Sequence, residues 1–415
     1  MRKLLLFIVP ILPLLVYGDG LKELIEYSKK QNDLVRSKEF SKQAKSQELE
    51  SKKSAYFPTL DVGAFYARDD EPTPMQPGDV YSAYAKVGFE IYDGGKKSSD
   101  VKQVQNELKS FSFLSVATQK NIALQIAENF FTIKSVESNL ASREEAQKSL
   151  KAQLDRVMRF YKAKLATKDD VDRLQAAHDT NMYEMESLKF QILSLKKSLE
   201  LQVGRTVSEL ENSSFTKEED TQYDTLESTK SLLAQEDSIR ARADALESMY
   251  YPKLKIEDTY SLYGYDRQDP VATSIGATPL DNQNTLMLTL SLRLFDYGQI
   301  AKTKEAVLLD SQALNAQASY QKKEQTVQFE LAKSRIDTAK LKIKSADSAL
   351  VAATGAYETV EKKYNAGIVD YVVYLDALTS RTSAKALYTS SLNDLELAYA
   401  MYYFYAGKNI EEFIK

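Results

Sequence analysis

Few side chains in this sequence are arranged for chemistry. There is no cysteine, which excludes disulfides, thiolate metal sites and a cysteine nucleophile. The one histidine, His178, lies on an otherwise apolar helical face with no second ligand in view, so we expect a packing residue and not a metal ligand. No phosphate-binding glycine loop, nucleophile elbow or HExxH-type helix is present. The sequence therefore predicts no enzyme, no cofactor and no bound metal.

Charge does not point to a polyanionic partner either. The formal net charge is −4, and acidic and basic residues are interspersed along helical patterns, which is typical of solvated helix surface. No basic face indicates nucleic acid as a partner. The remaining candidates are polar side chains beside two chain reversals, and long helices position them.

The clearest helix is a coiled-coil segment from Phe329 to Tyr364. Its apolar residues recur at a spacing that alternates between three and four, with large and small side chains that complement one another. The segment ends at Tyr364-Asn365-Ala366-Gly367, where glycine can take the left-handed conformation that closes a helix. We therefore expect the chain to reverse there. The seam consists of Phe329, Ala332, Ile336, Ala339, Ile343, Ala346, Leu350, Ala353, Tyr357, Val360 and Tyr364.

A second copy of this pattern lies about 203 positions earlier, so the chain is a tandem repeat. The earlier seam runs from Ile126 to Tyr161 and is apolar at eight of eleven places. Its reversal lacks the glycine and has Lys164 instead, and Asp169 or Asp170 can cap the return helix. The repetition predicts one body built from two similar halves.

The N-terminus has the pattern of a secretory leader. Three residues, Met1-Arg2-Lys3, precede an apolar run from Leu4 to Val16, and we expect cleavage after Gly18. A membrane anchor is the alternative, but about 13 apolar residues fall short of the ~20 needed to span a bilayer. No other segment is apolar enough for a transmembrane helix, so membrane insertion would have to use strands.

Four segments alternate apolar and polar residues as half-buried strands do. The fourth is the cleanest, with leucine at every second position from Leu286 to Leu294, which is typical of a lipid-facing barrel strand. Four strands cannot close a barrel, so several chains must share one. Two copies would give eight strands and a filled interior, whereas three give twelve and an aqueous bore, which the polar inner faces favour.

These patterns divide the chain into an ordered series of segments. We expect a signal peptide (1–18), an N-terminal periplasmic helix (19–55), a first barrel hairpin (56–93), a long helix, tip turn and return helix (96–203), an equatorial connection (204–222), a helix of the second repeat (223–249), a second hairpin (250–296), a second long helix, tip turn and return helix (299–406) and a C-terminal tail (407–415).

The joints of this series carry a family resemblance. The leader, the strand openings Phe57-Pro58 and Tyr251-Pro252, the strand-to-helix joins Tyr92-Asp93-Gly94-Gly95 and Phe295-Asp296-Tyr297-Gly298, and the Tyr364-to-Gly367 reversal together resemble the outer-membrane factor family of TolC-like efflux and type I secretion channels. The resemblance implies a mainly α protein with β-strands: a homotrimer with a twelve-stranded outer-membrane β-barrel and a long periplasmic α-barrel. It also implies a periplasmic adaptor and an inner-membrane transporter as partners, with outer-membrane lipid around the barrel.

The resemblance also implies a gate at the periplasmic tip. The family motif fits Gly367, Leu375, Asp376 and Ala377, so Asp376 matches the gate aspartate, with Asp370, Tyr371 and Tyr374 near enough to contribute. The aspartate that the family carries three residues earlier is Val373 here. Three copies of one carboxylate around a narrow bore would favour cations. The alternative is a solvated charge at a helix start. The tip turns, with Gly367, Tyr364, Tyr161, Lys164, Asp169 and Asp170, are the expected adaptor contacts.

One rival reading is a secreted structural or adhesive coiled coil whose hairpins cap the helices in solution. The exposed leucine face from Leu286 to Leu294 argues against it, because so much leucine needs lipid or a partner. Drug, metal-ion and protein export share the channel architecture, and this sequence does not choose among them.

Overall fold

The structure, a computed structural model, describes residues 19–73, 76–218, 221–268 and 279–415, together with Val271, Ser274 and Gly276. The expected signal peptide, 1–18, lies outside the described residues. The chain divides into two units, the first made from 1–37, 116–226 and 322–415 and the second from 38–115 and 227–321. Two long helices, α3 (Lys96–Lys162) and α7 (Gln299–Asn365), contribute to both units.

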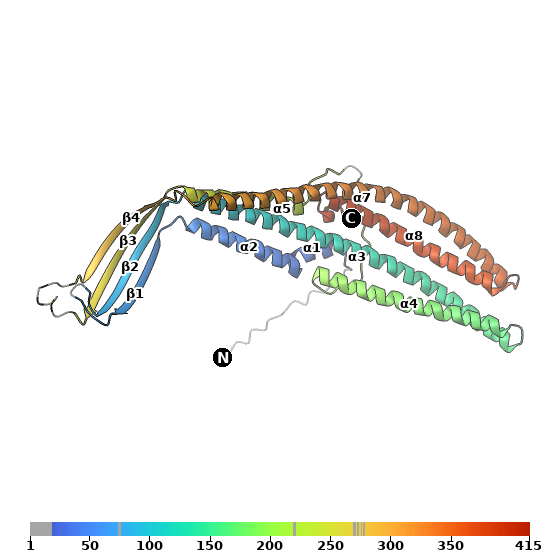
Figure 1. Cartoon of the computed structure of the whole chain (residues 1–415). Helices are drawn as coiled ribbons and strands as arrows, with labels where there is room; N and C mark the ends of the chain where they lie inside the picture. The colour runs from blue at the N-terminus through green and yellow to red at the C-terminus, as the bar shows by residue number, and fades with distance from the viewer. Residues whose placement is uncertain are drawn as a thin grey trace, which may run out of the picture. The chain divides into compact units, whose positions relative to one another are not determined.

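Two helical hairpins make up most of the first unit (Figure 1). Helix α4 (Lys168–Val203) returns along α3, and α8 (Tyr371–Tyr405) returns along α7. The predicted seam of α7 is confirmed, because its positions are the buried or half-buried ones of the helix while most residues between them are exposed. Alternating large and small residues thus bury one face of α7 and leave the opposite face exposed.

Side-chain contacts place the four helices of these hairpins in a row. Asn181 of α4 donates to Gln147 of α3 over 2.8 Å. Lys385 of α8 donates to Glu145 of α3 over 2.6 Å. Lys342 of α7 pairs with Asp394 of α8 at 2.7 Å. The order is therefore α4, α3, α8, α7, with α4 and α7 as the outer members.

The N-terminal segment forms two helices, where we predicted one. Helix α1 (Leu21–Gln31) ends at Asn32, and α2 (Asp33–Ser54) begins directly after it. The Asn32 amide donates to the carbonyl of Gln202 over 2.7 Å, and its side-chain oxygen accepts from the backbone of Leu34 over 2.8 Å. This buried side chain therefore caps α2 while it holds the end of α4, and the helix breaks at that point.

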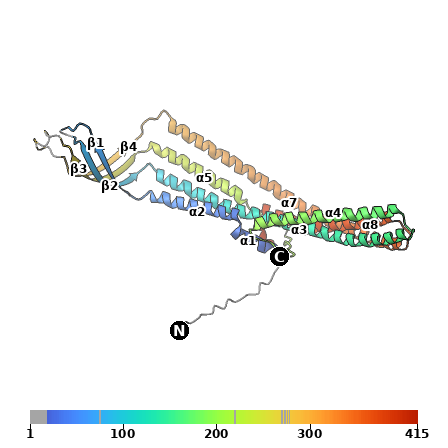
Figure 2. The same cartoon turned by 90° about the horizontal axis from the view of Figure 1, so that it is seen from below.

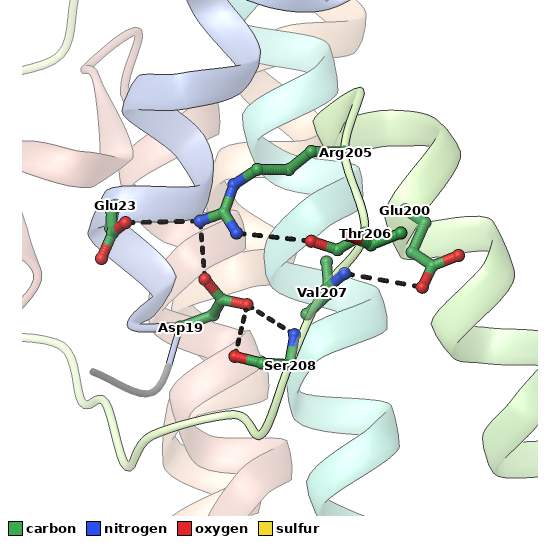
Figure 3. Close-up of polar contacts among 7 residues, drawn as sticks. All are labelled: Asp19, Glu23, Glu200, Arg205, Thr206, Val207 and Ser208. Carbon is green, nitrogen blue, oxygen red and sulfur yellow. Dashed lines mark hydrogen bonds and ion pairs between the residues drawn. The ribbon is translucent and has the colours of Figure 1, made fainter. Parts of the chain in front are cut away.

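The connection that follows α4 is held against the start of α1 (Figure 3). Arg205 donates to the Asp19 carboxylate over 2.6 Å, and the second oxygen of Asp19 accepts from the Ser208 backbone over 2.7 Å. Asp19 also forms a β-bridge with Leu210. Because Asp19 is buried, these donors replace the water that its carboxylate loses.

An aromatic cluster makes the core of the first unit beside this connection. Phe130 and Phe131 of α3 pack with Phe215, which in turn contacts Tyr403 of α8. Phe413 stacks on Tyr403 with a centroid distance of 3.9 Å, so the C-terminal tail closes this core. Aromatic rings from three segments distant in sequence thus fix the connection and the C-terminal tail.

The second unit places α2, α3, α5 (Glu227–Glu247) and α7 side by side (Figure 2). Lys45 of α2 pairs with Glu107 of α3 at 2.7 Å, and Ser311 of α7 donates to Glu236 of α5 over 2.7 Å. Helix α5 is shorter than the predicted 223–249 and is followed by the one-turn helix η1 (Ser248–Tyr250). No helix in the described part of the chain has the length and hydropathy to cross a membrane.

A single antiparallel sheet completes the second unit. Its strands are β1 (Thr59–Arg68), β2 (Asp79–Tyr92), β3 (Lys253–Asp266) and β4 (Asn282–Ser291), paired in that order. Strands β1 and β4 are edges, and one side of each backbone pairs with no other strand among the described residues. Every residue of β4 is exposed.

Two aspartates form the joins between sheet and long helix in the same way. Asp93 accepts from the backbone of Gly95 and Lys97, and Asp296 accepts from that of Gly298 and Ile300, over 2.6 to 2.9 Å. The carboxylates thereby satisfy the first amides of α3 and α7. The repeated Asp-x-Gly pattern in the sequence is this helix cap.

Candidate functional site

The two tip turns have the same backbone geometry. Gly367 has a φ of 72° and Lys164 a φ of 63°. In each turn the next residue donates back into the helix, Ile368 to Lys363 over 2.9 Å and Leu165 to Phe160 over 2.8 Å. Lysine therefore adopts the left-handed conformation that glycine takes in the second repeat, at a cost of about 1 to 2 kcal/mol.

The residue that caps the first return helix differs from our prediction. The cap of α4 is Thr167, not Asp169 or Asp170, and Asp170 completes a capping box with it. Asp169 pairs instead with Arg173 at 3.0 Å. In the second repeat, Asp370 caps α8 by accepting from two backbone amides over 3.0 and 3.1 Å. The carboxylate of Asp370 thus has a structural role in this chain.

The two tyrosines that end the long helices differ in exposure, and a third is fully enclosed. Tyr161 is exposed, whereas Tyr364 is half-buried. Tyr374 has no exposed surface and stacks on Tyr364 with a centroid distance of 4.8 Å. Burial raises the pKa of the Tyr374 phenol well above its ordinary value. This ring packs inside the tip, and its part in the gate stays a prediction.

Asp376 is exposed on α8, nearly two turns beyond Asp370, and lines a groove of about 520 Å³. Helices α4 and α8 form the walls of the groove, and α3 contributes its floor. Arg143 of α3 and Glu184 of α4 also line it and form an ion pair. Asp376 and Asp370 are the two predicted gate aspartates. Of these, only Asp376 has a carboxylate that does not cap a helix, and this carboxylate is open to solvent.

Two cross-hairpin ties near the tip were not predicted. Glu145 of α3 accepts from Arg381 over 2.8 Å and from Lys385 over 2.6 Å, both on α8. These donors lower the pKa of the Glu145 carboxyl, Lys385 most strongly. Closer to the turn, Arg156 of α3 donates to the side chain and backbone of Asn365 over 2.6 and 3.0 Å. Both ties join the first-repeat hairpin to the second.

His178 has no metal-site geometry. Its Nδ1 lies 2.9 Å from an oxygen of the adjacent Asp179, and its ring is half-buried along α4. No cluster of three or more histidine, aspartate or glutamate side chains suited to a metal ion occurs among the described residues.

The sheet presents one apolar face whose position shifts from strand to strand. Val62 of β1 pairs with Ala85, Ala85 with Tyr260 and Tyr260 with Asn284 of β4. The apolar run of β1 is thus level with polar β4, and the leucines that begin at Leu286 lie nearer the helical end. A band that slants across the register is what tilted barrel strands produce.

An acidic residue interrupts this band. Asp258 pairs with Val87 on one side and Leu286 on the other, and so points to the same face as they do. It is exposed. The alternation of β3 places Asp258 on the same face as Ile256 and Tyr260, so the sequence contained this signal and we did not use it.

Comparison with known proteins identifies the fold. No protein-family model matches the sequence, and no curated protein matches it. The CmeC outer membrane channel of Campylobacter jejuni is similar in structure, with a TM-score of 0.82, 13% identity and coverage of 94% of this chain and 86% of that one. The outer membrane protein VceC of Vibrio cholerae has a TM-score of 0.77 at 13% identity, covering 94% and 96% of the two chains.

A third solved structure describes an open channel. The open state of the MtrE outer membrane channel of Neisseria gonorrhoeae has a TM-score of 0.76 at 12% identity and covers 94% of this chain and 89% of that one. The chain therefore has the fold of bacterial outer-membrane channels over nearly its whole described length. The resemblance that we drew from the joints of the sequence is confirmed at the level of fold.

Proposed function

We propose that this chain is one of three copies that form an outer-membrane exit duct, through which substrates leave the periplasm. The strands of the copies share one twelve-stranded barrel, and the helical hairpins form a tunnel on its periplasmic side. An inner-membrane transporter and a periplasmic adaptor deliver the substrate, and the tip turns around Lys164 and Gly367 meet the adaptor. The class of substrate is set by the transporter.

The observation that carries this proposal is the sheet. The face that carries the leucines from Leu286 onward is apolar and exposed. Both edges of the sheet, β1 and β4, are unpaired within the part of the chain that the structure describes. An open edge is not tolerated in lipid, because each unpaired amide and carbonyl there costs several kcal/mol. Pairing of β4 with β1 of the next copy satisfies both edges, and closure of the ring removes them altogether.

The gate belongs to the same proposal. Three copies of Asp376 form an acidic ring at the tip of the tunnel, which favours cations and narrows the entrance. Asp370 supports the ring by fixing the first turn of α8, because its carboxylate accepts from the amides of Val372 and Val373. Tyr374 supports it from inside the hairpin.

Single-channel recording in planar bilayers tests the duct and the gate together. We expect small, cation-preferring currents from the purified protein and larger currents from Asp376→Ala. Asp347→Ala removes an exposed carboxylate from α7 and is the matched control. Unchanged currents in Asp376→Ala would remove that residue from the gate. An absence of current from well-folded, membrane-extracted protein would refute the duct and favour a structural coiled coil.

A further inference from the structure

Helix α7 has a second uncharged face, opposite its buried seam. This face consists of residues spaced alternately four and three apart, and none of them is charged, although lysine and aspartate are frequent elsewhere on α7. The residues are Val327, Leu331, Ser334, Thr338, Leu341, Ser345, Ser348, Ala352, Gly355 and Thr359. All of these positions are exposed. We call this the small face of α7.

The hydroxyl groups of the small face are turned inward to their own helix. Thr338 donates to the carbonyl of Ser334 over 2.9 Å, and Ser348 donates to that of Lys344 over 3.1 Å. A hydroxyl that bonds within its own helix loses little when water is removed. The small face is therefore suited to burial, and yet nothing in the described chain covers it.

Helix α4, at the other end of the row, has the complementary surface. Opposite its seam, the same spacing from Ala176 to Ser194 is also free of charge and includes Tyr183 and Phe190. Their exposed fractions are 74% and 72%. One turn later Lys197 interrupts the stripe, but its ammonium pairs with Glu200 at 2.6 Å. We call this the aromatic face of α4.

The two faces lie at matching heights along the helices. Asn181 of α4 contacts Gln147 of α3. The nearby Glu145 of α3 contacts Arg381 and Lys385 of α8. These two residues lie midway along α8 between Tyr374, which stacks on Tyr364 of α7, and Asp394, which pairs with Lys342 of α7. Tyr183 therefore lies at about the level of Ala352 on α7, and Phe190 at about the level of Ser345. The bulkiest side chains of one face are level with small or aliphatic residues of the other.

We propose that the aromatic face of α4 in one chain packs into the small face of α7 in the next. This inference rests on the proposed cyclic assembly, because rotation about an axis along the helices preserves height and brings opposite ends of the row together. Tyr183 enters the space between Ser348, Ala352 and Gly355. Large residues that fill gaps beside small ones give the interdigitated packing of a coiled-coil seam.

Cross-linking between engineered cysteines tests this contact, and the chain has no native cysteine. We combine Tyr183→Cys with Ser348→Cys in the full-length protein, extract it from membranes and treat it with a short bismaleimide. Covalent dimers and trimers are expected, and each single variant should remain monomeric on a denaturing gel. The matched control pairs Tyr183→Cys with Asp347→Cys, which is exposed at the same height but rotated by about 100° around α7.

A charge placed in the contact provides a second measurement. Ser348→Arg should reduce the trimer fraction at least ten-fold by light scattering and leave the helical content unchanged, whereas Asp347→Arg should keep the trimer. A trimer that cross-links through Asp347 but not through Ser348 would overturn this contact and leave the duct intact. Protein that is monomeric without any substitution would overturn the duct as well.

Discussion

In the proposed duct, the tie at Glu145 predicts how firmly the tip is held closed. Its carboxylate accepts from both Arg381 and Lys385, and so joins α3 to α8 close to Asp376. Glu145→Gln keeps the shape of the side chain and removes its charge. If the tip opens by movement of α8 away from α3, the wild-type tie must break each time, and the variant should open more often.

The size of this effect follows from exposure. The side chains of Glu145, Arg381 and Lys385 are 42%, 24% and 44% exposed, so solvent screens both pairs. Such pairs contribute about 0.2 to 1 kcal/mol each. A loss of about 1 kcal/mol for the two together raises the ratio of open to closed tips about five-fold.

The same tie predicts a dependence on pH. Hydrogen bonds from Lys385 and Arg381 hold the pKa of Glu145 below its ordinary value in the folded protein. A depressed pKa means that the tie contributes fully above the unfolded-state pKa and is lost as the pH falls through the folded-state pKa. Wild type should therefore approach the behaviour of Glu145→Gln in acid, while the variant shows no such step from this group.

Open probability in planar bilayers measures the effect, and a neighbouring residue supplies the control. Glu144 is the exposed residue directly before Glu145 on α3, and Glu144→Gln removes a negative charge without changing the contacts of Glu145. We expect a higher open probability for Glu145→Gln alone. Equal open probabilities in the two variants would show that the tie does not restrain α8, and the reasoning from the Glu145 geometry would fail.

Three further substitutions test the two turns and the sheet. Lys164→Gly should raise the free energy of unfolding by about 0.5 to 1 kcal/mol, because glycine takes the left-handed conformation without strain; Gly367→Ala should lower it, and urea midpoints that move the other way would contradict this. Asp258→Leu should stabilise the protein in lipid by about 1 kcal/mol, because it removes a charge from the apolar band; the refolding midpoint in vesicles measures it, and an unchanged midpoint would place Asp258 outside the hydrocarbon.

The periodic parts of this fold were predictable from the sequence. The seam from Phe329 to Tyr364 and the leucines from Leu286 to Leu294 each follow one period, and one period specifies which face is buried. The break at Asn32 has no such signal, because it depends on the carbonyl of Gln202, about 170 residues away. The sequence did contain a signal for the α4 cap, since Thr167 and Asp170 are spaced as a capping box.

The candidate site was only partly predictable for a related reason. The motif around Gly367 located Asp376, but a tyrosine is compatible with either a core or a lumen wall, and only packing against Tyr364 assigned Tyr374 to the core. The pairing of Glu145 with Arg381 joins residues 236 positions apart. No local periodicity encodes such a contact, because it exists only after the two repeats lie side by side.

The two repeats differ in polarity beside the tip groove, which Arg143, Asn181 and Glu184 of the first repeat line. In the first repeat Arg143, Asn181 and Glu184 form a polar cluster, in which the Asn181 amide donates to the Arg143 carbonyl over 3.1 Å. The equivalent positions of the second repeat, about 203 residues later, are Ala346, Ala384 and Leu387. A polar group in an apolar seam lowers stability but fixes the register of the two helices.

A fixed register is what the proposed contact between chains requires of α4. If α4 slipped by one heptad along α3, or about 10 Å, Tyr183 would leave the level of Ala352 and meet a different part of α7. The slip would also leave the buried amide of Asn181 against apolar residues, at a cost of about 1 to 3 kcal/mol. The polar cluster therefore fixes the register of the hairpin that carries the aromatic face of α4. The hairpin of α7 and α8 has apolar residues at the equivalent positions and no such cluster there.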